Sequence, residues 1–183
     1  MKGIVFTEFL ELVEEKFGLE MVDKIILNSE LESGGIYTSV GTYSFSEMLQ
    51  LLQNLNKETG IEIDALLEVY AAHFFGVIET SYPKMLSSYK DPFDMLSSIE
   101  SHIHVEVRKI YPDAELPTFE VVEKTDNFLV MLYKSSRAMH HFGLGLMKKT
   151  FSYFGESATI ELEKIQADGT EVKFSIIRNN ESK

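Results

Sequence analysis

The sequence predicts an α+β fold, with a helical N-terminal part and a smaller antiparallel sheet on which one helix packs. Apolar side chains recur at helical spacing over most of residues 4–111. After residue 117, short runs rich in β-branched and aromatic residues alternate, with one more helical stretch among them. The chain has 183 residues, is 44% hydrophobic and contains no low-complexity linker or internal repeat. We therefore expect residues 1–183 to form a single domain around a sizeable core.

Five helices are expected before Pro112, each bounded by a glycine, a proline or a capping residue. They cover residues 4–17, 19–29, 45–59, 62–79 and 92–111. Ser44 and Glu47 have the spacing of a capping box at the start of the third helix. Asp91-Pro92 is a strong start for the fifth, with Asp as the N-cap and Pro at the first helical position. The passage 36–43 between the second and third helices is expected to be extended and irregular.

Four strands and one helix are expected in the remainder of the chain. The strands cover residues 118–123, 128–133, 158–165 and 171–178, and the helix covers residues 139–154. Thr125-Asp126-Asn127 and Asp168-Gly169 are the turn signals of two hairpins. Gly143 and Gly145 fall inside the helix, where close packing explains them better than phosphate binding. The tail 179–183 is polar, and we expect it to fray.

Composition excludes several classes of function. The chain has no cysteine, which rules out disulfides, thiolate catalysis and cysteine-based zinc sites. Its net charge of −12 argues against nucleic acid and anionic membrane as partners. It has no secretory signal and no apolar run of roughly 18 residues, so we expect a cytoplasmic protein without a membrane span. No catalytic motif or nucleophile with a base can be placed, so we expect a protein that is not an enzyme.

The segment Tyr133-Lys134-Ser135-Ser136-Arg137 follows an apolar run that is typical of a strand. In an extended chain, residues two apart project to the same side, so Tyr133, Ser135 and Arg137 would form one row. Two hydroxyls and a guanidinium are suited to carboxylates, because arginine can bind one bidentately. The frayed end of a surface strand has the same spacing and is the commoner arrangement for charged side chains.

Histidines are the candidate metal ligands. His102 and His104 lie two apart on one expected helix, so their side chains diverge and cannot easily share a metal ion. Each lies about 100° of helix rotation from the apolar seam at Ile103, so the periodicity does not choose between them. Both are also compatible with an ordinary place at the boundary of the core. His73 lies on an apolar helix face, where a packed core histidine is the commoner interpretation.

One helical histidine, an apolar pocket and a carboxylate-binding row together describe a haem site, which needs an axial imidazole, flat apolar walls and partners for two propionates. At these positions the chain resembles the haem-nitric oxide/oxygen binding (H-NOX) family, which includes the sensor domain of soluble guanylate cyclase. Tyr133-x-Ser135-x-Arg137 is similar to the family's YxSxR propionate motif. The stretch that begins at His104 and ends at Pro112 is similar to the one that begins at the family's proximal histidine. Pro117 falls where the family has a proline that presses on the haem.

The resemblance spans essentially the whole chain, including Met1-Lys2-Gly3 and Ile36-Tyr37-Thr38. It implies haem b (iron protoporphyrin IX) as the cofactor and His104, rather than His102, as the iron ligand. It also implies a distal gas pocket on the opposite side of the haem. The residues expected to line that pocket are Val5, Phe9, His73, Phe74, Phe142 and Leu146.

Phe142 occupies a position similar to that of a distal tyrosine in oxygen-binding members of the family. Phenylalanine donates no hydrogen bond, and bound O₂ gains more from a donor than NO or CO does. The resemblance therefore implies a sensor that binds NO and CO at ferrous iron and binds O₂ poorly. His73 is the alternative source of a distal donor.

The mechanism that the resemblance implies is sensing rather than turnover. NO would bind the iron opposite His104 and weaken the bond to it, so that the helix that carries His104 and the sheet that carries Tyr133 could shift. Because the chain has no room for an output domain, we expect a separate partner, which in similar bacterial proteins is a histidine kinase or a cyclic-di-GMP enzyme. A cofactor-free interaction module and an NO carrier are the alternatives.

Overall fold

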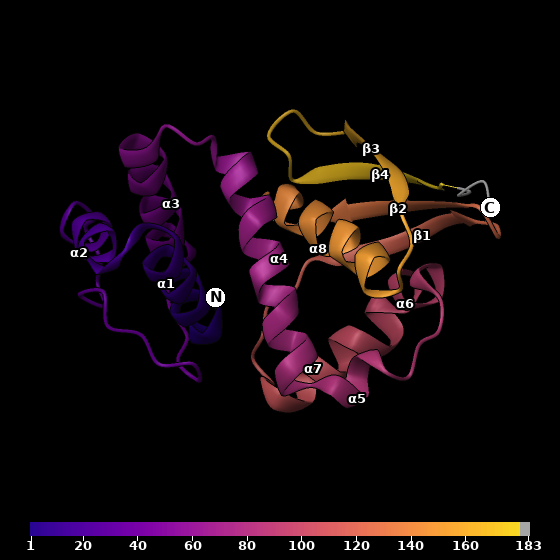
Figure 1. Cartoon of the computed structure of the whole chain (residues 1–183), viewed down its shortest axis with the longest axis horizontal. Coiled ribbons are helices and arrows are strands. Elements are labelled where there is room, and N and C mark those ends of the chain that lie inside the picture. The colour runs from indigo at the N-terminus through magenta and orange to yellow at the C-terminus, as the bar shows by residue number, and fades with distance from the viewer. Residues whose placement is uncertain (180–183) are drawn as a thin grey trace.

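The computed structural model describes residues 1–179 and confirms the predicted α+β fold (Figure 1). The helices are α1 (Gly3–Phe17), α2 (Leu19–Leu27), α3 (Phe45–Thr59), α4 (Ile63–Ser81), α5 (Pro83–Leu86), α6 (Pro92–Ser97), the π-helix η1 (Ile99–Ile103), α7 (His104–Ile110) and α8 (His140–Tyr153). The strands are β1 (Thr118–Lys124), β2 (Phe128–Lys134), β3 (Ala158–Lys164) and β4 (Glu171–Arg178). The fraying predicted for the tail concerns residues 180–183, which lie outside the described part of the chain.

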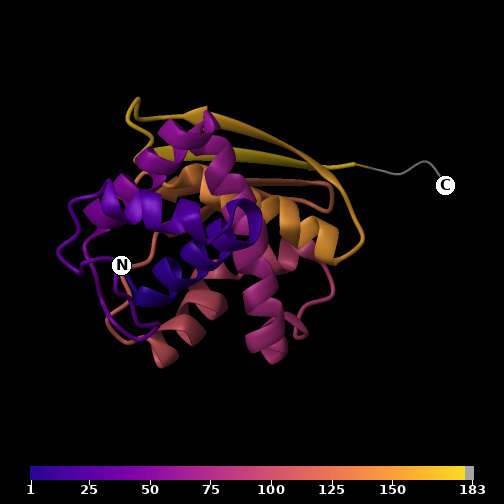
Figure 2. The ribbon, with the colours of Figure 1, turned by 60° about the vertical axis from the view of Figure 1, so that its left-hand side comes forward.

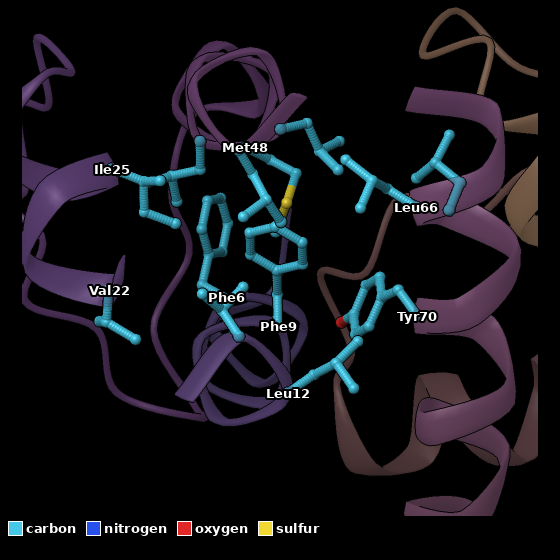
Figure 3. Packing of buried hydrophobic residues seen from close by; sticks show 13 residues of the cluster. Phe6, Phe9, Leu12, Val22, Ile25, Met48, Leu66 and Tyr70 are labelled. Atoms are coloured by element: carbon cyan, nitrogen blue, oxygen red, sulfur yellow. The ribbon is translucent and has the colours of Figure 1, made fainter. Parts of the chain in front are cut away.

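The helices α1, α2 and α3 form one end of the molecule, and α4 separates them from the sheet (Figure 1). Their core is aromatic and aliphatic, and Phe6, Phe9, Ile25 and Met48 point toward one another inside it (Figure 3). The Tyr70 hydroxyl on α4 donates to the Val5 carbonyl at 2.6 Å, which fastens α4 to α1. The N-terminal helices are therefore joined to the rest of the chain through buried contacts.

The loop between α2 and α3 is held by Glu47, which corrects part of the predicted capping box. Ser44 caps α3 as expected, because its hydroxyl accepts from the Ser46 amide at 3.3 Å. The Glu47 carboxylate, however, accepts from the Ser33 hydroxyl at 2.5 Å and from the Tyr37 hydroxyl at 2.7 Å. Because Glu47 is buried, its carboxylate needs hydrogen-bond donors, and the loop supplies them. The predicted bond from the Ser44 amide to the Glu47 side chain is replaced by these contacts.

The sheet is antiparallel, with the order β1-β2-β4-β3, and α8 covers one of its faces. On β2, Leu129, Met131 and Tyr133 alternate toward α8 and are buried. On β4, Val172, Phe174 and Ile176 do the same. Because alternate residues of a strand face the same side, these two strands supply the apolar floor on which α8 rests.

Helices α4 and α8 lie side by side in both views (Figures 1 and 2). A Cβ atom on Gly145 would lie 2.6 Å from the Ala71 Cβ and 2.8 Å from the Glu68 carbonyl oxygen. The close packing predicted for Gly145 is therefore confirmed. His141 of α8 adds polar contacts, with its ring nitrogens 3.0 Å from Glu68 and 3.2 Å from Asp64.

The single helix predicted over residues 92–111 is wrong, because η1 interrupts it. The amides of Ile103 and His104 donate to carbonyls five residues back, on Ser98 and Ile99. These consecutive bonds form one π-turn, which accommodates a single extra residue. The side chains after η1 are therefore rotated by about 100° from the positions that a continuous α-helix would give them. The apolar seam inferred from a 3.6-residue period does not continue unchanged through this segment.

Candidate functional site

A cavity of about 270 Å³ lies where α1, α4, α7, α8 and the start of the sheet meet. Its walls are mostly apolar. The apolar side chains that line it include Ile4, Val5, Phe74, Val77, Ile78, Met85, Ile103, Val107, Leu116, Pro117, Phe119, Met139, Phe142 and Leu146. The polar side chains are fewer and comprise Lys2, Tyr82, His104, Tyr111, Glu115, Tyr133, Ser135 and Arg137. An apolar cavity with a few convergent polar groups is the usual form of a cofactor or ligand site.

His104 supplies the imidazole of this cavity and is only 7% exposed. Its Nδ1 lies 3.0 Å from the Glu100 carboxylate. The same carboxylate oxygen accepts from the Phe119 amide at 2.8 Å, so β1 holds Glu100 in position. A carboxylate accepts hydrogen bonds, so Nδ1 carries the proton and the lone pair remains on Nε2. Burial lowers the pKa of His104 despite the opposing effect of Glu100, which favours a neutral ring that can bind a metal.

His102 does not line the cavity. Its Nδ1 is hydrogen-bonded to the Tyr89 hydroxyl, and the two rings lie 5.6 Å apart. Residues two apart on a helix diverge, and η1, which ends immediately before His104, rotates the residues that follow it relative to a continuous α-helix. The structure thus distinguishes between two residues that helical periodicity could not separate.

Tyr133, Ser135 and Arg137 all line the cavity, as predicted, but not as alternate residues of one strand. Strand β2 ends at Lys134, and the next residues form a turn in which the Ala138 amide donates to the Ser135 carbonyl at 3.2 Å. The Arg137 amide donates to the Ser135 hydroxyl at 3.2 Å, which tightens the same turn. Ala138 adopts a φ of 51°, which only the folded surroundings hold in place. The three side chains converge through this turn.

Arg137 has carboxylate and carbonyl partners at the mouth of the cavity. One guanidinium nitrogen donates to the Glu115 carbonyl at 2.8 Å, and another donates to the Glu115 carboxylate at 2.6 Å. Tyr133 is more deeply buried and packs against Phe119, with ring centroids 5.4 Å apart. Burial raises the pKa of Tyr133, so its hydroxyl remains a hydrogen-bond donor at neutral pH.

Six residues were predicted to line a distal pocket, and the cavity brings four of them together: Val5, Phe74, Phe142 and Leu146. Phe9 and His73 are not among its lining residues. Phe9 points into the N-terminal core, with its ring 5.4 Å from that of Tyr70 (Figure 3). His73 Nε2 lies 3.5 Å from the Glu8 carboxylate, so the imidazole bridges α4 to α1 instead. Phe74, the next residue on α4, does line the cavity, because adjacent residues of a helix point about 100° apart.

Two tyrosines of the cavity, Tyr82 and Tyr111, were not predicted from the sequence. Burial, reinforced by the neighbouring Tyr82 hydroxyl, raises the pKa of Tyr111 to about 12. Both residues directly precede a proline at which a helical pattern stops, Pro83 and Pro112. This position marked them as helix ends, but nothing in the local sequence indicated that both helix ends reach one cavity.

The donor set of the cavity fits haem. It offers one neutral imidazole, flat aromatic walls from Phe119 and Phe142, and hydroxyl and guanidinium donors from other lining residues. Within residues 1–179, no group of three or more His, Asp or Glu side chains is placed to hold a metal ion. A single imidazole suits an iron whose other ligands come from a macrocycle better than it suits a bare ion. None of the helices described in residues 1–179 is long and apolar enough to cross a membrane.

Comparison with known proteins supports the same assignment. Residues 2–162 match the family model described as "Haem-NO-binding". The chain is 72% identical to an Fe(II) unliganded H-NOX protein from K. algicida, with a TM-score of 0.98 and coverage of 100% of this chain and 99% of that one. It is 38% identical to the H-NOX protein from Shewanella woodyi, with a TM-score of 0.84 and coverage of 100% and 97%.

Among curated relatives, soluble guanylate cyclase 89Da of Drosophila melanogaster is 26% identical over 157 residues. That alignment covers 84% of this chain but only 23% of the cyclase, so the chain spans about a quarter of that relative's length. The domains of the matched family are haem-based gas sensors rather than catalysts. The family match over most of the chain and the high identity to a solved member show that this protein belongs to the haem-NO-binding, or H-NOX, family.

Proposed function

We propose that this chain, over residues 1–183, is a single haem b domain that senses NO and CO at ferrous iron and binds O₂ poorly. The observation that carries the proposal is that one mostly apolar cavity contains both His104 and the carboxylate-binding set Tyr133, Ser135 and Arg137. Either group alone has a simpler explanation. Their convergence indicates a ligand that binds an imidazole at one place and carries carboxylates at another.

Each of these residues has a role that its surroundings support. His104 would hold the haem iron through Nε2, because Glu100 keeps the proton on Nδ1. Tyr133, Ser135 and Arg137 would hold the propionates by hydrogen bonds that the guanidinium charge strengthens. Pro117 lies on the cavity wall, where it would contact the haem. When bound, haem supplies an iron with an open coordination position for diatomic gases.

The ligand preference is inferred from the distal residues. Val5, Phe74, Phe142 and Leu146 line the cavity, and none of their side chains can donate a hydrogen bond. Such walls favour NO and CO over O₂, whose bound form carries partial negative charge. The S. woodyi relative, 38% identical to this chain, was solved in an Fe(II)CO state.

Signal output is inferred to reach a separate protein, such as a histidine kinase or a cyclic-di-GMP enzyme, in the cytoplasm. The segment after α7 supports transmission to the surface, because Asp113 accepts from Lys2 at 3.1 Å and from Thr42 at 2.9 Å. Figure 2 shows the N-terminus beside this segment. A shift of α7 would therefore be transmitted to the N-terminal helices through these contacts.

Absorption spectroscopy tests the proposal directly. The protein is expressed with a haem precursor, reduced, and recorded alone and with CO, NO or air. We expect a Soret band typical of five-coordinate ferrous haem, clear shifts with CO and NO, and little change in air. A colourless protein would indicate a cofactor-free interaction module. Slow NO release with no effect on a candidate partner's activity would indicate an NO carrier.

A further inference from the structure

Arg137 already holds a carboxylate that belongs to the protein. The Arg137 side chain is 16% exposed, whereas that of its partner Glu115 is 84% exposed. Both residues line the cavity, and both also line an adjoining surface groove of about 400 Å³. The carboxylate of Glu115 therefore lies at the mouth of the proposed haem site, at the guanidinium assigned to a propionate.

The Glu115 carboxylate is not needed to orient Arg137. A second guanidinium nitrogen donates to the Glu115 main-chain carbonyl, which persists whatever the side chain is. The Ser135 hydroxyl also accepts from the Arg137 amide and so fixes the turn that carries Arg137. The neighbouring Asp113 is anchored separately by Lys2 and Thr42. Loss of the Glu115 carboxylate should leave both the loop and the guanidinium in place.

We propose that Glu115 is an internal competitor for the haem propionate at Arg137, and that it sets how readily this chain releases haem. The inference rests on the proposed function. Two carboxylates that share one guanidinium repel each other, so only one of them can be fully stabilised there. Glu115 gains little from the ion pair because its side chain is mostly in water. Because the Glu115 main chain is itself bonded to Arg137, its carboxylate nevertheless has a high effective concentration at the guanidinium whenever a propionate dissociates.

The test is a haem-loss assay on the holoprotein, in which an excess of apomyoglobin captures released haem and the Soret band is followed. Glu115→Gln is compared with the unsubstituted protein, with Arg137→Ala and with the double variant. Glu120→Gln is the matched control, because Glu120 is an exposed glutamate on β1 that does not line the cavity. From the usual contribution of an exposed ion pair, we expect Glu115→Gln to slow haem loss roughly two- to fivefold.

Glu120→Gln should release haem at the unsubstituted rate, and Glu115→Gln should have no effect once Arg137 is alanine. An unchanged or faster loss from Glu115→Gln would overturn the proposal, since Glu115 would then orient Arg137 or be irrelevant to it. Equal slowing by Glu115→Gln in the Arg137→Ala background would overturn it as well, because the effect would not pass through Arg137. Absence of a Soret band in the unsubstituted protein would instead refute the haem assignment, so the two failures are distinguishable.

Discussion

Two polar parts of the cavity, which we call the imidazole end and the guanidinium end, are built in different ways. At one end, His104 is buried, and its partner Glu100 is itself held by a main-chain amide of β1. At the other end, Arg137 pairs with a glutamate whose side chain is 84% exposed. Polar contacts away from water are stronger and more rigid than those at the surface. We infer that the imidazole end is preorganised, whereas the guanidinium end can exchange partners.

The largest effect should come from the preorganised end. We expect His104→Gly to lose haem more than roughly a hundredfold faster, since removing a group that merely hydrogen-bonds to a metal ligand commonly costs ten- to hundredfold. His102→Gly should retain haem, because His102 bonds to Tyr89 outside the cavity. Haem content and the ferrous Soret spectrum of the two purified variants measure this. A protein that loses its five-coordinate spectrum only with His102→Gly would reverse the assignment.

Glu100 sharpens the comparison, because it holds His104 and the Phe119 amide without lining the cavity itself. We expect Glu100→Ala to weaken haem retention about ten- to hundredfold and to alter the ferrous spectrum. Glu106→Ala is the control, since Glu106 lies on α7 with His104 but pairs with the surface residue Lys109. Glu100→Gln keeps an acceptor oxygen and should recover part of the loss. Identical spectra and retention in Glu100→Ala and Glu106→Ala would show that His104 needs no fixed partner.

Phe142 tests the apolar wall of the cavity. Its ring packs 5.1 Å from Tyr70 and 5.7 Å from Phe74. A hydroxyl in this position would supply the donor that the distal side chains lack. One hydrogen bond should make O₂ binding by Phe142→Tyr roughly two- to tenfold tighter, with a smaller change for CO. Gas titration of the reduced protein measures both affinities, and equal changes for O₂ and CO would contradict the distal placement.

The smallest expected effect is a dependence of stability on pH near the guanidinium end. The ring centroids of His140 and Tyr133 lie 6.5 Å apart. His140 is 4% exposed, and neither of its ring nitrogens has a hydrogen-bond partner among the described residues. Burial lowers its pKa, and nearby His141 and Lys164 add to the effect. Below about pH 6.5, His140 is protonated in the unfolded chain but remains neutral in the folded chain. The free energy of unfolding therefore falls as the pH is lowered.

Urea unfolding of the unsubstituted protein and of His140→Gln at pH 7.5 and 5.5 measures this contribution. The variant should lose less stability between the two pH values, even if its stability at pH 7.5 is lower. An equal loss in both proteins would assign the acid sensitivity to other groups.

Much of the fold could be predicted because it depends on local patterns. Glycines, prolines and capping residues bounded most helices within two residues of the observed ends, and apolar runs, alternation and turn signals located the four strands. The errors occurred where a distant partner overrides a local rule. Glu47 bonds to a loop that only the folded chain brings near it, and η1 changes the helical period at a place with no local signal.

The sequence by itself determined the α+β class, the order of the elements and the short set of polar residues from which a site could be made. Apolar periodicity and donor chemistry are properties of the chain, so they can be read without coordinates. Tertiary structure decided which of these residues meet. It placed His104, and not His102, at the cavity, brought Ser135 and Arg137 together through a turn beyond β2, and directed Phe9 and His73 away from the cavity. One residue more or less in a helical turn moves a side chain by about 100°, so only the packed backbone can settle which face it joins.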